Sequence, residues 1–160
     1  MLAIDPLKAS RHRRTLRVPC VLLLLVAPFV AIAAETKSPA EQVFAVERSF
    51  AKAMADRNLQ DFANFLADEA VFFAGTQPLR GRKQITHAWA AYFAEADPPF
   101  SWDPDQVEVL ESGTLALSTG PVRDPSGKIV ARFHSIWRLE APGVWRIVFD
   151  KGSPSSPGPE

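Results

Sequence analysis

A stretch near the C-terminus, residues 128–151, constrains the fold more than any other part of the chain. Two runs rich in β-branched and aromatic residues, 128–140 and 144–151, flank a turn at Pro142 and Gly143. This pattern predicts a long antiparallel hairpin. A hairpin with a wide apolar face is not stable alone in water. The rest of the chain must therefore cover one face of this hairpin.

The N-terminal residues 1–33 have the composition of a targeting segment. Five basic residues precede an apolar run at 18–30, and the small residues 31–33 have the spacing that signal peptidase requires. We interpret residues 1–33 as a signal peptide cleaved after Ala33, and we expect a periplasmic or secreted protein. An uncleaved anchor is the alternative, but the run is short for a bilayer span and contains two prolines. Arg13 and Arg14 partly resemble a twin-arginine signal, although the leucine-rich run fits the general secretory route better.

Cleavage changes both the charge and the cysteine content. The full chain of 160 residues is formally neutral, but residues 34–160 carry 13 lysines and arginines against 17 aspartates and glutamates. They also lack Cys20, so no disulfide contributes to stability and the core must suffice alone. Nothing in this part has the basic character of a nucleic-acid-binding surface. We expect neither a nucleic-acid partner nor membrane contact after cleavage.

Helical signals begin directly after this segment. Ser38, Pro39 and Glu41 form a capping-box pattern, which predicts a helix ending near residues 57–58. Its apolar residues Val43, Val46, Phe50 and Met54 recur at helical spacing, and we expect Glu47 on the opposite, polar face. Asn58 is the expected cap of a second, short helix at 59–66. A strand at 70–74, a loop around Pro78 and a third helix at 82–95 follow.

The remainder of the chain has the pattern of antiparallel strands. We expect a strand at 100–110 interrupted at Pro104, a strand at 115–122 broken or kinked at Gly120 and Pro121, a turn at 124–127 and then the hairpin. Residues 153–160, rich in serine, proline and glycine, predict a disordered tail. The domain at 34–152 is thus an α+β fold, with three N-terminal helices packed in a strongly curved antiparallel sheet.

Several segments resemble the SnoaL-like members of the nuclear transport factor 2-like superfamily, and more narrowly its branch labelled as a domain of unknown function. They are ERSFAKAMADRNLQDF (47–62), FLADEAVFF (65–73), GRKQI (81–85), IWR (136–138) and WRIVFD (145–150). The resemblance covers nearly all of residues 38–152. It implies a cone, in which a bent sheet wraps around helices and leaves a pocket at its open end, often in a homodimer. It does not specify a reaction, because the superfamily includes isomerases, cyclases, dehydratases, hydrolases and non-enzymatic binders.

Ketosteroid isomerases are the best-known enzymes of this group. They use a tyrosine and a protonated aspartic acid as oxyanion donors, and a second aspartate as proton shuttle. Aligned with this chain, these positions fall on Phe50, Ser135 and Ala74, so none of the three is retained. We therefore expect no isomerase chemistry by that constellation.

One pair of residues suggests a different catalytic arrangement. If the hairpin register brings Asp150 beside His134, the carboxylate would orient the imidazole as a general base. A slip of one residue would put the two on opposite faces. The alternative, which we favour, is a surface histidine beside a salt-bridged aspartate. We find no metal signal, because His87 and His134 lack i,i+4 or cysteine partners, and no motif for a cofactor.

Aromatic side chains predict an apolar pocket with few polar groups. The candidate lining residues are Phe50, Phe73, Trp89, Phe93, Trp102, Thr119, Phe133, Ser135 and Trp137. We expect a homodimer that binds a small, mostly apolar molecule without a cofactor. The alternatives are an isomerase, dehydratase or hydrolase that uses His134 and Asp150, and a non-catalytic dimerising module.

Overall fold

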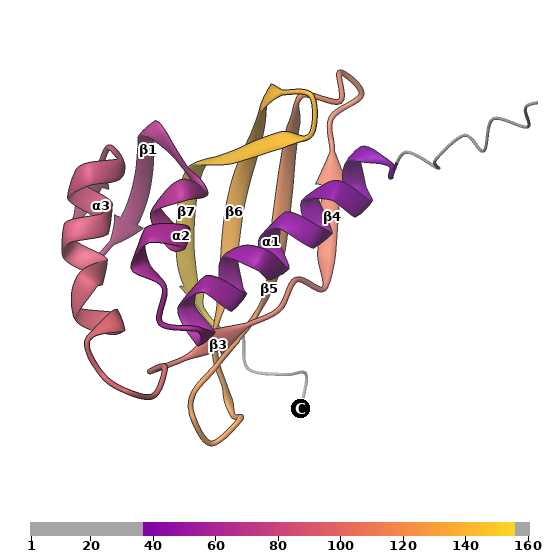
Figure 1. The fold of residues 1–160 in the computed structure, drawn as a ribbon. Coiled ribbons are helices and arrows are strands. Elements are labelled where there is room, and N and C mark those ends of the chain that lie inside the picture. Colours follow the sequence, from indigo (N-terminus) through magenta and orange to yellow (C-terminus); the bar gives the residue numbers. More distant parts are fainter. Residues whose placement is uncertain (1–36, 156–160) are drawn as a thin grey trace, which may run out of the picture. The chain divides into compact units, whose positions relative to one another are not determined.

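In the computed structural model, which describes residues 37–155, three α-helices lie against one face of a curved, unclosed sheet of seven strands (Figure 1). The expected signal peptide and residues 156–160 lie outside the described residues. No helix in the described part is long and apolar enough to cross a membrane.

The first two helices begin where the sequence predicts. Helix α1 (Pro39–Ala55) has the predicted capping box, in which the Ser38 side chain accepts from the Glu41 amide and Glu41 accepts from the Ser38 amide at 2.7 Å. Helix α2 (Leu59–Asn64) is capped by Asn58, which accepts from the Asp61 amide at 3.0 Å. It ends two residues before the predicted boundary, because the chain enters strand β1 (Leu66–Ala74) directly afterwards. Helix α3 (Arg82–Trp89) continues as a 3-10 turn, η1 (Ala90–Phe93).

The sheet has the order β2-β1-β7-β6-β5-β3, with β4 also paired to β5. Its other strands are β2 (Gln77–Arg80), β3 (Ser101–Trp102), β4 (Gln106–Val109), β5 (Leu115–Arg123), β6 (Ile129–Ala141) and β7 (Val144–Pro154). All pairings are antiparallel except that of β1 with β7, which is parallel. The predicted α+β class, the long C-terminal hairpin and the interruption near Pro104 are confirmed.

Three local predictions were wrong. Residues 77–80 form β2 instead of a loop, and Pro78 is tolerated there because β2 is an edge strand. Strand β5 runs unbroken through Gly120 and Pro121, so the break expected there is absent; the two residues lie between those paired to β4 (116–119) and those paired to β3 (122–123). Strand β7 includes Ser153 and Pro154, which the sequence had suggested for the tail, because both pair with β6.

Gly120 allows the chain between β3 and β4 to pass close over β5. A Cβ atom at this position would lie 2.1 Å from the Asp103 carbonyl oxygen and 2.9 Å from Cε1 of Phe133. Only a residue without a side chain fits under that carbonyl.

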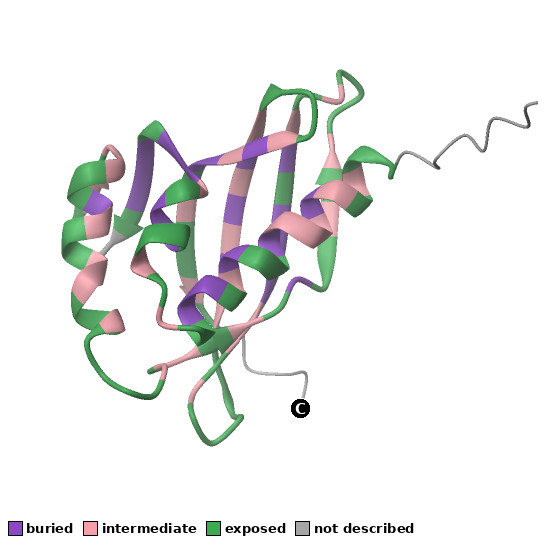
Figure 2. Cartoon of the chain, viewed as in Figure 1, coloured by how far each residue is buried: buried purple, intermediate pink, exposed green. Residues whose placement is uncertain are grey.

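The helices bury the inner face of the sheet. Buried residues alternate with less buried ones along β6 (Figure 2), as a two-residue side-chain period requires, whereas the consecutive residues Ser118, Thr119 and Gly120 of β5 are all buried. On β6 the buried set is Phe133, Ser135 and Trp137, whereas His134 and Ile136 belong to the outer face. The inner face of β5, β6 and β7 therefore positions any internal site.

Candidate functional site

A cavity of about 210 Å³ opens between the helices and the inner face of the sheet. It is lined by Phe50, Phe72, Phe73, Trp89, Phe100, Trp102, Val122, Ala131, Phe133, Asp150 and Gly152. Among these lining residues, Asp150 alone has an ionisable side chain. The cavity therefore combines an apolar wall with a single carboxyl group, as small-molecule sites commonly do.

The aromatic wall is assembled from elements far apart in the chain. Phe50 of α1 meets Trp102 of β3 edge to face, with ring centroids 5.3 Å apart. Phe72 of β1 meets Trp89 of α3 in the same way at 5.5 Å, and Phe100 lies 6.0 Å from Trp102. Such contacts between rings restrict their movement, which favours a preformed cavity.

Asp150 is held by the strand beside it. It lies on β7 directly opposite Ser135 of β6, and the Ser135 hydroxyl donates to Oδ2 of Asp150 at 2.8 Å. Burial of the carboxyl in apolar surroundings raises the pKa of Asp150 to about 7, and the negative charge of Glu47 acts in the same direction. The side chain is thus poised to gain or lose a proton near neutral pH.

Glu47 is a second, deeper carboxyl group. It extends from α1 into the core with no exposed surface. Oε1 accepts from the Trp102 indole at 2.8 Å, and Oε2 accepts from the Trp137 indole at 2.8 Å and from the Ser118 hydroxyl. No cation of residues 37–155 forms an ion pair with it. Burial raises the pKa of Glu47, and these hydrogen bonds partly oppose that rise.

The prediction that Glu47 lies on the polar face of α1 was wrong. Val43, Glu47, Phe50 and Met54 follow one another at intervals of four, three and four residues, and all four are buried. That spacing places them on one face of a helix. The apolar neighbours of Glu47 at those intervals were the signal that would have located it.

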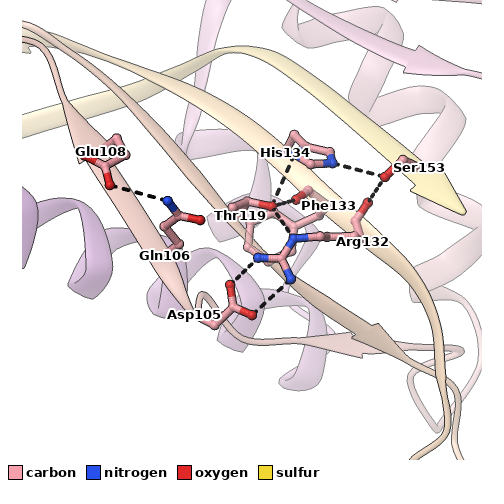
Figure 3. Close-up of polar contacts among 8 residues, drawn as sticks. All are labelled: Asp105, Gln106, Glu108, Thr119, Arg132, Phe133, His134 and Ser153. Carbon is pink, nitrogen blue, oxygen red and sulfur yellow. Dashed lines mark hydrogen bonds and ion pairs between the residues drawn. The ribbon is translucent and has the colours of Figure 1, made fainter. Parts of the chain in front are cut away.

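The pair of His134 and Asp150 is not formed. In the register of the hairpin, His134 lies opposite Lys151 and Asp150 opposite Ser135, so the two side chains lie on opposite faces of the sheet. The His134 ring instead contacts two hydroxyls on the outer face, Thr119 Oγ1 at 3.2 Å and Ser153 Oγ at 3.0 Å (Figure 3).

The tautomer of His134 follows from its neighbours. Thr119 donates its single proton to the Phe133 carbonyl at 2.6 Å and accepts from Arg132 Nε at 3.0 Å. Nδ1 of His134 must therefore carry the proton that it shares with Thr119, whereas Nε2 lies 3.0 Å from the Ser153 hydroxyl, whose single proton is also directed at the Arg132 carbonyl 3.4 Å away. Partial burial and the positive charges of Arg132 and Lys151 lower the pKa of His134.

The Arg132 guanidinium fixes the other end of this cluster. It forms a two-pronged pair with the Asp105 carboxylate, including a contact from Nη1 to Oδ2 at 3.0 Å (Figure 3). This outer cluster lies on the other side of the sheet from the cavity and has no contact with Asp150.

The structure brings five of the nine predicted pocket residues to the cavity: Phe50, Phe73, Trp89, Trp102 and Phe133. The other four lie elsewhere. Phe93 packs on Phe62 with centroids 5.2 Å apart, and Thr119 points to the outer face. Ser135 and Trp137 are buried behind the cavity.

Six lining residues were missing from the predicted pocket set, and one of them is Asp150, which the sequence had suggested as a catalytic partner of His134. The others are Phe72, Phe100, Val122, Ala131 and Gly152. Ala131 has the same strand parity as Phe133, so the alternation of β6 already contained the signal for it. Among residues 37–155, no three His, Cys, Asp or Glu side chains are grouped closely enough to hold a metal ion.

Comparison with known proteins agrees with this architecture. The model of the SnoaL-like domain family matches residues 46–147, which is more than half of the chain. None of the curated proteins matches the sequence.

Solved structures share the fold at low sequence identity. A nuclear transport factor 2-like protein of unknown function from Pseudomonas putida is 20% identical, with a TM-score of 0.61 over 77% of this chain and 91% of that one. A putative dehydratase from Streptomyces avermitilis is 18% identical, with a TM-score of 0.58 over 75% and 98%. A ketosteroid isomerase-like protein from Erwinia carotovora is 15% identical, with a TM-score of 0.58 over 76% and 100%. At these identities the similarity concerns the fold alone.

Proposed function

Since the chain belongs to the SnoaL-like domain family of the nuclear transport factor 2-like superfamily, we propose that it binds a small, mostly apolar molecule in its internal cavity. The observation that carries this proposal is the aromatic wall with the single carboxyl of Asp150. Apolar walls supply affinity by excluding water, and one polar group orients the ligand.

The size of the cavity limits the ligand. At about 210 Å³, it is smaller than the several hundred cubic ångströms that drug-sized molecules occupy. We therefore expect a ligand of one or two rings, or a short branched chain, with one polar group directed at Asp150.

Blocking the cavity tests this proposal. Ala131→Phe adds a ring to a residue that lines the cavity, whereas Ala141→Phe adds the same ring to an exposed position at the end of β6. In fluorescence titrations with a neutral naphthalene probe, we expect Ala131→Phe to weaken binding at least about tenfold, and Ala141→Phe to leave it unchanged. Equal binding by both variants and the natural protein would place the probe outside the cavity.

Native mass spectrometry of the protein from its own source would identify the ligand. A mass above that of the chain, released on denaturation, would give its chemical class. The same spectrum tests the homodimer, which stays a prediction, as does export from the cytoplasm.

A second candidate function is acid–base catalysis, and the position of Asp150 favours it. A carboxyl with a pKa of about 7 inside an apolar cavity has the properties of a general acid or base at neutral pH. In this alternative, an isomerase, dehydratase or hydrolase would use Asp150 supported by Glu47, not by His134. With the ligand identified above, Asp150→Asn should abolish turnover but retain binding, and unchanged turnover would exclude this alternative.

A further inference from the structure

Three inward-facing side chains form a row across neighbouring strands: Ser118 of β5, Ser135 of β6 and Asp150 of β7. Ser118 is the Cα partner of Ser135, and Ser135 is the Cα partner of Asp150. Both serines are completely buried. The Ser118 hydroxyl donates to Glu47 at one end of the row, and the Ser135 hydroxyl donates to Asp150 at the other. The row thus connects Glu47 of α1 at one end to Asp150 of β7 at the other.

The two carboxyl groups differ in the number of hydrogen bonds that they accept. Glu47 accepts from Trp102, Trp137 and Ser118, and each of these groups points a proton at it. An indole nitrogen only donates, so both oxygens of Glu47 act as acceptors, as in the ionised form. Asp150 accepts from Ser135 and otherwise borders the apolar cavity.

Among the described residues, no positive charge lies beside Glu47 and Asp150 to offset their negative charges. Lys151 and His134 belong to the outer face, and β1 and α3 contribute the apolar Phe72 and Trp89 to the cavity. Two carboxyls in such surroundings, without a cation, cannot both be ionised at small cost. The carboxyl with three donors keeps the negative charge, and the other takes the proton.

We infer that Glu47 is a positioning residue whose buried negative charge holds Asp150 in its acid form, so that the cavity offers a proton donor to its ligand. This rests on the proposed function and narrows it. The ligand class that follows is an apolar molecule with an uncharged hydrogen-bond acceptor, such as a carbonyl oxygen, and not an amine. The raised pKa of Asp150 agrees with this assignment.

The first test needs no ligand. Carboxyl-carbon NMR of protein labelled at aspartate follows the titration of Asp150, whose signal Asp150→Asn identifies. In Glu47→Gln the buried charge is gone, and the Asp150 midpoint should fall, by about one pH unit. Ser118→Ala removes one donor from Glu47 with little risk to the fold, and should lower the midpoint less.

The matched control is Glu69→Gln, which removes an exposed carboxylate on the outer face that pairs with Arg138. It should leave the Asp150 midpoint unchanged. An identical Asp150 midpoint in the natural protein, Glu47→Gln and Ser118→Ala would overturn the inference.

The second test compares three probes of similar shape: 2-acetylnaphthalene, 2-isopropenylnaphthalene and 1-(2-naphthyl)ethylammonium. Below neutral pH the ketone should bind about tenfold tighter than the hydrocarbon, which corresponds to one hydrogen bond. That advantage should decrease as pH rises through the Asp150 midpoint, and should do so at lower pH in Glu47→Gln. Tightest binding of the ammonium probe would overturn the inferred ligand class.

The two tests separate the possible failures. If none of the three probes binds, the proposed function fails for this ligand size, and the titration of Asp150 in Glu47→Gln still decides the role of Glu47. If the ketone binds more tightly than the hydrocarbon, but this advantage depends neither on pH nor on the Glu47→Gln substitution, the cavity is a binding site and the positioning role of Glu47 is wrong.

Discussion

His134 and Ser135 are consecutive residues of β6, yet they face opposite chemical environments. His134 lies on the outer face among hydroxyls, and partial burial together with the cations Arg132 and Lys151 lowers its pKa. Ser135 lies on the inner face next to Asp150, whose pKa is raised by burial and by a second carboxyl. The sheet therefore separates a face that favours the neutral imidazole from one that favours the neutral carboxyl.

A single position along β6 decides which of these two environments a side chain enters. Because the side-chain period is two, a shift of the hairpin by one residue would exchange the two environments. The bulges of the β6–β7 pairing, between Ile136 and Trp137 and between Leu139 and Ala141, set the register that is observed. The chemistry of each face thus depends on irregularities near the turn.

The largest difference between the two faces should appear in the free energy of unfolding of their variants. Glu47→Ala leaves two indole donors and one hydroxyl without their acceptor in the core, and we expect it to lower the free energy of unfolding by about 3 kcal/mol. His134→Ala removes hydrogen bonds at a partly exposed site and should lower it by about 1 kcal/mol or less. Urea unfolding followed by circular dichroism would measure both, and equal effects would contradict the contrast.

The pH dependence should have opposite signs on the two faces. The raised pKa of Asp150, about 7 against 3.8, means that the folded state holds an extra proton, so this contribution to stability is complete below about pH 4 and is lost as pH rises through about 7. The lowered pKa of His134 has the reverse effect, because its contribution increases as pH rises toward 6.5.

Two variants should separate these contributions. Relative to the natural protein, Asp150→Asn should become progressively more stable with rising pH, by at most about 1.4 kcal/mol per pH unit, whereas His134→Gln should become progressively less stable. Unfolding midpoints measured between pH 5 and 8 would show the two trends. Parallel trends in both variants would mean that the faces are not electrostatically distinct.

A smaller effect is expected at Thr119. Thr119→Val removes the hydroxyl that accepts the Nδ1 proton of His134, so we expect the ring to populate both tautomers. Nitrogen-15 chemical shifts of the imidazole would report this change, and Asp150 on the other face should titrate as before. An unchanged tautomer would show that Ser153 alone orients the ring.

The smallest stability effect is expected at Arg132. Its pair with Asp105 is half-exposed, so Arg132→Gln should change the free energy of unfolding by less than about 1 kcal/mol. It removes a positive charge that lowers the pKa of His134, so that pKa should rise. A proton NMR titration of the imidazole would detect the rise, and a lower pKa would contradict it.

The sequence was informative where local chemistry determines structure. The capping box at Ser38, the cap at Asn58 and the hairpin around Gly143 are short-range features, and the structure confirms them. Strand β2 was missed because its pairing with β1 depends on contacts outside the segment itself.

The site was only partly accessible from the sequence. The aromatic wall could be predicted because large apolar side chains at strand and helix spacing must be covered. The partner of Asp150 could not, because it depends on two bulges that leave no mark in the hydrophobic pattern. Glu47 was misplaced because a charged residue was assigned to solvent, although its spacing from Val43 and Phe50 put it on the buried face.

The indole contacts of Glu47 give the molecule an internal optical reporter. Trp102 and Trp137 both donate to this carboxylate, and Trp102 also borders the cavity, whereas Trp145 donates to Gln42. A change in the charge of Glu47 would alter the emission of the first two, and entry of a ligand would alter the emission of Trp89 and Trp102, which both line the cavity. Replacing one tryptophan at a time by phenylalanine would therefore separate the change in fluorescence emission caused by protonation of Glu47 from the change caused by ligand binding.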